Sequence, residues 1–255
     1  DFGAKFLVEH HADLFAGIRY ALGEFGGFSL DVGGQRFYPI MVAEKQLCAL
    51  TATFRGPAGH GSLPVRDGAM AKLARALGRL NRRRLPVHVT PAARLMFTRL
   101  AAALPGATGL LLRQLLNPAL TDRVLDMLGE RGRIFDPLLH HTVSPTMPGF
   151  APADLLAELR ALLGREVELE VVRHDPGPAE PDLGLFDTLA AVLRQADPAG
   201  VPVPLLLSGV TDGRFFARLG IQTYGFLPMQ LPPDFSFVGT IHGADERIPV
   251  EAVAF

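Results

Sequence analysis

The chain has 255 residues, of which 48% are hydrophobic, and this composition excludes an intrinsically disordered protein. Its 25 Lys and Arg balance 26 Asp and Glu, so no basic surface is expected for nucleic acid or for an anionic membrane. The single Cys excludes an internal disulfide framework, and any metal site must therefore use His, Asp and Glu.

No apolar run reaches the roughly 20 residues that a membrane-spanning helix needs. The first residues, DFGAKFLVEH, have neither an initiator Met nor the basic start and cleavage site of a signal peptide. We therefore expect that the chain continues upstream of Asp1. The single Cys is compatible with a cytoplasmic protein, which is the compartment we expect.

Hydrophobic periodicity predicts the elements of the first half of the chain. A helix is expected early in residues 2–15, a short strand at 18–22, and two strands within 35–54. The helix predicted over 67–84 is amphipathic, and more helices follow over 91–131, broken at Pro105-Gly106 and Asn117-Pro118.

The second half alternates helices and strands, which is typical of an α/β layer. A helix is predicted over 150–164 and a strand over 166–174, before a Pro-rich linker at 175–184 that is the best candidate for a domain boundary. The helix FDTLAAVLRQA (186–196), the strand VPLLLSG, the helix TDGRFFARLG and the strand IQTYGFLP come after it.

Three glycine-rich loops concentrate polar side chains, and catalytic residues are often found on such loops. The loops contain Glu24, His60 and His242, respectively. A carboxylate and a neutral imidazole together suit zinc. Asp245, Glu246 and Arg247 follow His242 and are expected to organise its loop through hydrogen bonds.

Four separated motifs resemble, in order and wording, the M20 family of zinc peptidases and amidohydrolases, especially its carboxypeptidase-S-like branch. They are ALGEFGGF, GPAGHGSLP before a helix, SGVTDGRFFARLGIQTYGF, and HGADERIPVEA. The resemblance implies a discontinuous α/β catalytic domain over 1–47 and 180–255. It also implies a smaller ferredoxin-like α+β lid domain with a helical insert over 48–179.

The resemblance also implies roles for individual residues. Glu24 resembles the carboxylate that ligates one zinc ion, and His242 the imidazole that ligates the other, in a site of one or two ions. His60 resembles the small-domain histidine that binds the substrate and stabilises the developing oxyanion, often across a dimer. Independently of the resemblance, Ser208 and Gly209 either approach the substrate or simply end a strand.

The sequence departs from the family pattern in two respects. The family has an upstream His-x-Asp, a bridging Asp and a Glu-Glu pair, and no Glu-Glu occurs in this chain. HHTVSPT (140–146) is followed directly by MPGF, where the family has about two more strands. We expect that both parts lie outside the sequence, so that the Cα atoms of Thr146 and Met147 lie far beyond about 3.8 Å apart. The competing hypothesis is a truncated, inactive gene product.

The remaining candidates have structural interpretations. His88, His140 and His141 lack the spacing of metal ligands and are predicted to be surface or turn residues. Cys48 lies in a strand pattern and is predicted to be a small buried hydrophobic residue.

These observations predict zinc-dependent hydrolysis of a peptide or N-acyl amide bond next to a free carboxylate. The substrate would be a small peptide or an N-acyl amino acid, and the enzyme a homodimer formed through the lid domain. The alternative is a truncated or non-catalytic relative that binds a ligand or dimerises. A metal-independent Rossmann-like binding protein is disfavoured, because no Gly-x-Gly-x-x-Gly follows a strand.

Overall fold

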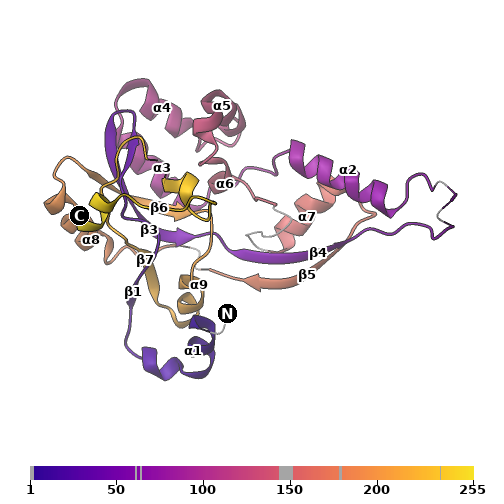
Figure 1. Ribbon diagram of the computed structural model, residues 1–255, viewed down its shortest axis with the longest axis horizontal. Helices are drawn as coiled ribbons and strands as arrows, with labels where there is room; N and C mark the ends of the chain where they lie inside the picture. Colours follow the sequence, from indigo (N-terminus) through magenta and orange to yellow (C-terminus); the bar gives the residue numbers. More distant parts are fainter. Residues whose placement is uncertain (1–2, 61, 64, 144–151, 178–179, 236) are drawn as a thin grey trace. The chain divides into compact units, whose positions relative to one another are not determined.

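The computed structural model describes residues 3–60, 62–63, 65–143, 152–177, 180–235 and 237–255, and within them the protein is mixed α/β (Figure 1). The chain divides into two compact units. Unit 1 comprises residues 1–44, 89–132 and 177–255, and unit 2 comprises residues 45–88 and 133–176. Residues 89–132, expected within the 48–179 domain, thus cluster with unit 1. The predicted break between Thr146 and Met147 lies outside the described residues.

Unit 1 is built on a mixed five-stranded sheet. Its strands are β1 (Tyr20–Gly23), β2 (Leu30–Val32), β3 (Gln35–Glu44), β6 (Val201–Leu207) and β7 (Gln222–Gly225). The order is β1-β7-β3-β2, and β6 also pairs with β3. β1 runs parallel to β7 and β3 parallel to β6, whereas β3 is antiparallel to both β2 and β7. The centre of β3 is continuously buried, as expected for a strand covered on both faces.

The helices of unit 1 precede, interrupt and follow these strands. They are α1 (Ala4–His10), α3 (Pro91–Ala103), α4 (Gly106–Gln114), α5 (Thr121–Leu128), α8 (Phe186–Ala196), α9 (Gly213–Phe216) and α10 (Phe237–Thr240). The start of α3 shows why a helix begins there: Thr90 caps it by accepting a hydrogen bond from the backbone of Ala93 at 3.1 Å, and Pro91 occupies the first turn. No helix among the described residues combines the length and the apolar character that crossing a bilayer requires.

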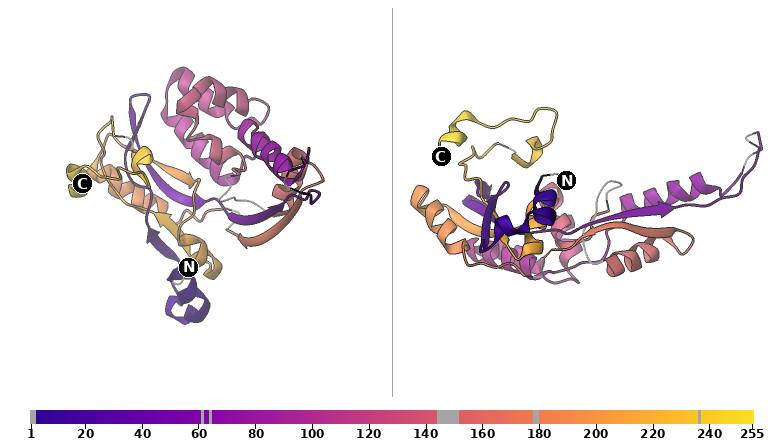
Figure 2. Two further views of the ribbon diagram at one scale, coloured as in Figure 1. Left: turned by 45° about the vertical axis from the view of Figure 1, so that its right-hand side comes forward. Right: turned by 90° about the horizontal axis from the view of Figure 1, so that it is seen from below.

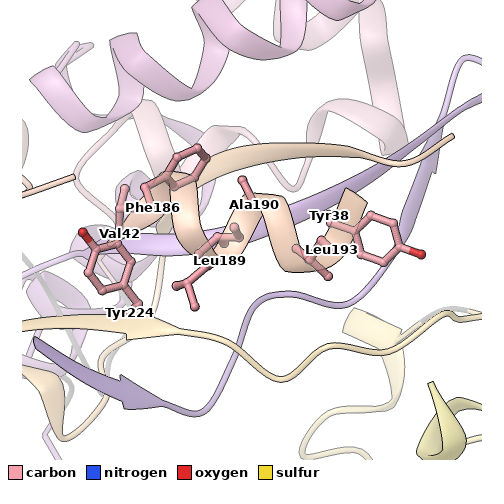
Figure 3. Packing of buried hydrophobic residues seen from close by; sticks show 8 residues of the cluster. Tyr38, Val42, Phe186, Leu189, Ala190, Leu193 and Tyr224 are labelled. Carbon is pink, nitrogen blue, oxygen red and sulfur yellow. The ribbon is translucent and has the colours of Figure 1, made fainter. Parts of the chain in front are cut away.

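One core of unit 1 lies between α8 and the sheet (Figure 3). The helix contributes apolar residues at the spacing of one helical face, and alternate residues of β3 meet them. The buried members are Tyr38, Ile40, Val42, Phe186, Leu189, Ala190, Leu193 and Tyr224. This packing fixes β3 and β7, and thereby the loops that follow the strands of the sheet.

Unit 2 contains a two-stranded antiparallel ladder with helices alongside it (Figure 2). The strands are β4 (Leu47–Thr53) and β5 (Glu168–Asp175), and the helices are α2 (Ala69–Arg82), α6 (Asp136–Leu139) and α7 (Pro152–Leu163). Cys48 is fully buried in the core among residues from α2 and α7, which confirms its predicted burial. A ferredoxin-like sheet has four strands, whereas the described residues of unit 2 form a sheet of two. The predicted ferredoxin-like lid domain therefore stays a prediction.

Lys45 joins two distant segments of unit 2. It is 6% exposed, and its ammonium group donates hydrogen bonds to the carbonyl oxygens of Pro137 and His140 and to Oγ1 of Thr142, at 2.8, 3.0 and 3.1 Å. Burial lowers the pKa of Lys45 to about 8, against the opposing charge of Asp136. The ammonium group is therefore still charged at neutral pH and clamps residues 137–142 to the start of β4.

The lowered pKa of Lys45 predicts that unit 2 becomes more stable as the pH rises from 8 to 10.5. In this range the unfolded chain, with the ordinary pKa of 10.5, binds more protons than the folded chain. The free energy of unfolding should gain up to about 3 kcal/mol over the window, as measured by urea denaturation followed by circular dichroism. Lys45→Met should lack this gain; parallel pH curves for the two proteins would contradict the prediction.

Candidate functional site

Glu24 directly follows β1 and begins a turn with an unusual backbone. The next three residues all have positive φ: Phe25 at 68°, Gly26 at 111° and Gly27 at 80°. A side chain at Gly26 would meet the backbone of β3 and β7 at 2.5–3.1 Å, so only glycine fits there. The amide of Gly27 donates to the carbonyl of Pro39 at 2.6 Å. The turn thus presents the exposed carboxylate of Glu24 from a fixed backbone.

His242 also lies on a turn of restricted conformation. It follows α10 and has a φ of 56°, a left-handed value that is uncommon for a residue other than glycine. The amide of Gly243 donates to the carbonyl of Thr240 at 3.1 Å, and the amide of His242 donates to Glu246 at 3.3 Å. The hydrogen bond from His242 to Glu246 confirms that Glu246 helps to organise this loop. The imidazole of His242 is exposed.

Aromatic packing connects the segments that carry these two residues. Phe237, at the start of α10, lies against Phe25 and Phe28, with ring centroids 6.5 and 4.4 Å apart. All three phenylalanines belong to one hydrophobic cluster of unit 1. The structure therefore brings the turn of Glu24 and the helix preceding His242 to the same part of unit 1. Their roles as zinc ligands stay predictions.

The predicted substrate residues Ser208 and Gly209 are exposed and follow β6. Leu207 pairs with Glu44, so this loop lies at the carboxyl end of β3. Because β7 is antiparallel to β3, the carboxyl end of β3 lies near the amino ends of β1 and β7. Glu24 follows the carboxyl end of β1. The topology thus places Ser208 and Gly209 at the other end of these strands from Glu24.

Glu44 holds the loop that contains Ser208 and Gly209, a role that the sequence analysis missed. Its carboxylate accepts hydrogen bonds from the backbone amide and Oγ1 of Thr211, at 2.6 and 2.8 Å. Burial raises the pKa of Glu44, against these hydrogen bonds. The available sequence signal was a carboxylate directly after the apolar run of residues 37–43.

His60 lies on the loop between β4 and α2 in unit 2 and is exposed. Its Nδ1 is 2.7 Å from Oγ of Ser62, and the Ser62 amide donates to the same nitrogen at 3.3 Å. These contacts occupy Nδ1, so Nε2 is the nitrogen available to a ligand. Gly61, between the two residues, lies outside the described residues.

The prediction that His140 and His141 are surface or turn residues is wrong, since both are only 3% exposed and neither lies in a turn. They are buried because the segment 140–142 is held by Lys45 and faces α7. His141 and His88 each contact the Glu158 carboxylate of α7, at 2.7 and 2.6 Å. Burial lowers the pKa of His141, against the effect of Glu158. The spacing of these residues in the sequence does not predict the cluster, because they come from separate segments that meet only in the folded unit.

Comparison with known proteins supports the resemblance to the M20 family at a coarse level. The chain is similar to the N-fatty-acyl-amino acid synthase/hydrolase PM20D1 of Homo sapiens, with 25% identity over 263 residues. The match covers 89% of this chain and 51% of the human protein, so the chain spans about half the length of that relative. No protein-family model and no solved structure matches the chain.

Proposed function

We propose that the chain is part of an M20-type, metal-dependent amidohydrolase that cleaves N-acyl amino acids next to their free carboxylate. The similarity to a relative named as an N-fatty-acyl-amino acid synthase/hydrolase, over 89% of this chain, is the observation that carries the proposal. The packing of the turn of Glu24 near the helix preceding His242 supports it.

The donor groups of Glu24 and His242 are of the kinds that bind zinc. Zinc is bound in proteins by imidazole nitrogen and carboxylate oxygen, and these two exposed side chains offer one of each from turns of restricted backbone conformation. When bound, zinc polarises a carbonyl group and lowers the pKa of water. In a site of two ions, Glu24 would hold one and His242 the other, and His60 would donate a hydrogen bond from Nε2 to the oxygen of the scissile carbonyl.

Chelation provides the test of this proposal. The full-length protein should release the free amino acid from an N-fatty-acyl amino acid, and removal of metal by a chelator should abolish the release until zinc is added back. The methyl ester of the same substrate is the control, because it lacks the carboxylate and should be a poor substrate. Unchanged turnover after metal removal would reject metal dependence.

The alternative of a non-catalytic relative gives the opposite result in the same assay. It predicts binding of N-acyl amino acids without turnover, at any metal concentration. A homodimer formed through the predicted lid domain belongs to either proposal, and sedimentation equilibrium of the full-length protein would measure it.

A further inference from the structure

Three segments that are distant in the sequence meet around one carboxylate in unit 2. His88 follows α2 and the loop after it, His141 follows α6, and Glu158 lies in the middle of α7. A short antiparallel bridge aligns the first two segments: Val87 pairs with His140, and the amide of His88 donates to the carbonyl of Leu139 at 2.7 Å. Residues 87–88 and 139–141 therefore have a defined register.

The donor atoms of these three side chains converge. Nε2 of His88 is 2.6 Å from Oε1 of Glu158, and Nδ1 of His141 is 2.7 Å from Oε2 of Glu158. The two imidazole rings lie with their centroids 4.3 Å apart at an interplanar angle of 30°. One ligand atom from each residue lies within 4.8 Å of the others. Among the described residues, no other group of three or more His, Cys, Asp or Glu side chains meets this criterion.

We propose that His88, His141 and Glu158 form a binding site for a divalent transition-metal ion, and that zinc is the ion that fits best. Two imidazoles and one carboxylate are a known zinc ligand set, and three protein ligands leave the fourth tetrahedral position for water or another ligand. The imidazole tautomers that bind metal are those whose lone pairs face Glu158. The ion would cross-link α7 to the bridge at residues 87–88 and 139–141.

The burial of the cluster suits such a site. The side chains of His141, Glu158 and His88 are 1%, 12% and 30% exposed, so the cluster opens to solvent beside His88. Lys45, which holds the segment next to His141, has its ammonium group engaged with two carbonyl oxygens and the Thr142 hydroxyl. The Glu158 carboxylate partly offsets the charge of the metal ion. The competing interpretation is a hydrogen-bonded His-Glu-His group with no affinity for metal.

Metal titration of the full chain separates the two interpretations. The background is the Glu24→Gln, His242→Gln double variant, so that zinc bound at those side chains is not counted. Equilibrium dialysis should show about one bound zinc ion per chain. The Tm should rise by roughly 5–10 °C at a zinc concentration a hundredfold above Kd. Cobalt(II) at the same site should give the intense visible bands of four-coordinate geometry.

Matched variants identify the ligands. His88→Gln and Glu158→Gln, each added to the background, should weaken zinc binding by at least about tenfold and reduce the Tm shift at the same zinc concentration by about half or more. His174→Gln is the control, because His174 lies in unit 2 but contacts Gln46 at 3.1 Å, outside the cluster. Unchanged zinc binding in His88→Gln, or a background protein that binds no zinc and shows only weak cobalt bands, would overturn the site. The cobalt spectrum needs no substitution within the cluster, so it decides the matter even if these variants unfold.

Discussion

Replacing His60 with alanine should lower kcat of the full-length protein toward an N-acyl amino acid by about 10²–10³-fold, with a much smaller change in KM. The reason is that a hydrogen bond from Nε2 would strengthen as charge develops on the carbonyl oxygen, and so would act mainly in the transition state. The substitution should leave the fold intact, because His60 is exposed and its side chain contacts Ser62 at 2.7 Å. Steady-state kinetics checks the result, and an effect confined to KM would indicate simple substrate binding.

Two further variants refine the His60 prediction. Ser62→Ala removes the hydroxyl group next to Nδ1 but keeps the imidazole, so it should lower kcat much less than His60→Ala. If His60 acts across a dimer interface, mixing His60→Ala with Glu24→Gln should restore roughly one quarter of the normal activity, because half the dimers are mixed and each has one complete site. No recovery in a sample proven to exchange subunits would place His60 at the active site of its own subunit.

Gly225→Ala should destabilise unit 1 by about 3 kcal/mol or more. An added Cβ at Gly225 would lie 1.7 Å from the carbonyl oxygen of Phe25 and 2.7 Å from Cβ of Met41. The backbone oxygen has little room to move, because the adjacent peptides are tied by hydrogen bonds from Phe226 to Gly23 and from Leu227 to Gly26, at 3.0 and 2.6 Å. Relief of the clash therefore requires β7 to separate from β3 or from the turn after Glu24.

Urea denaturation followed by circular dichroism measures this loss. Gly209→Ala is the stability control, because a Cβ there would meet its nearest heavy atom only at 4.0 Å. The control should have nearly the midpoint of the unsubstituted protein, whereas Gly225→Ala should have a much lower one. Equal midpoints for the two variants would contradict the prediction, because they would show that the turn after β1 moves to accommodate the added Cβ at little cost in stability.

Hydrophobic periodicity predicted the regular elements well where an amphipathic face is long. The helix predicted over 186–196 is α8 with those bounds, and the helix predicted over 67–84 is α2, two residues shorter at each end. Periodicity reports which face of a helix is apolar, but it does not name the surface that covers that face. For this reason the sequence did not reveal that residues 89–132 cluster with unit 1.

Local sequence patterns are likewise limited in predicting the candidate sites, because they do not identify distant partners. Glu24 and His242 are recognisable because their chemistry sits within short local motifs that include glycines needed for positive φ. The cluster of His88, His141 and Glu158 has no local signature, since its members come from three segments and meet only when unit 2 folds. Glu44 is an intermediate case: it directly follows an apolar run in the sequence, but its partner Thr211 is 167 residues away.

Because Cys48 lies in the core of unit 2, chemical labelling of its thiol can follow the unfolding of that unit separately. Cys48 has no exposed surface, and burial raises the pKa of its thiol, so an alkylating reagent can react with it only after the core around it opens. Since the chain has one thiol, every modified molecule reports an opening of that unit and not of its neighbour. The rate of Cys48 labelling therefore measures local unfolding of unit 2.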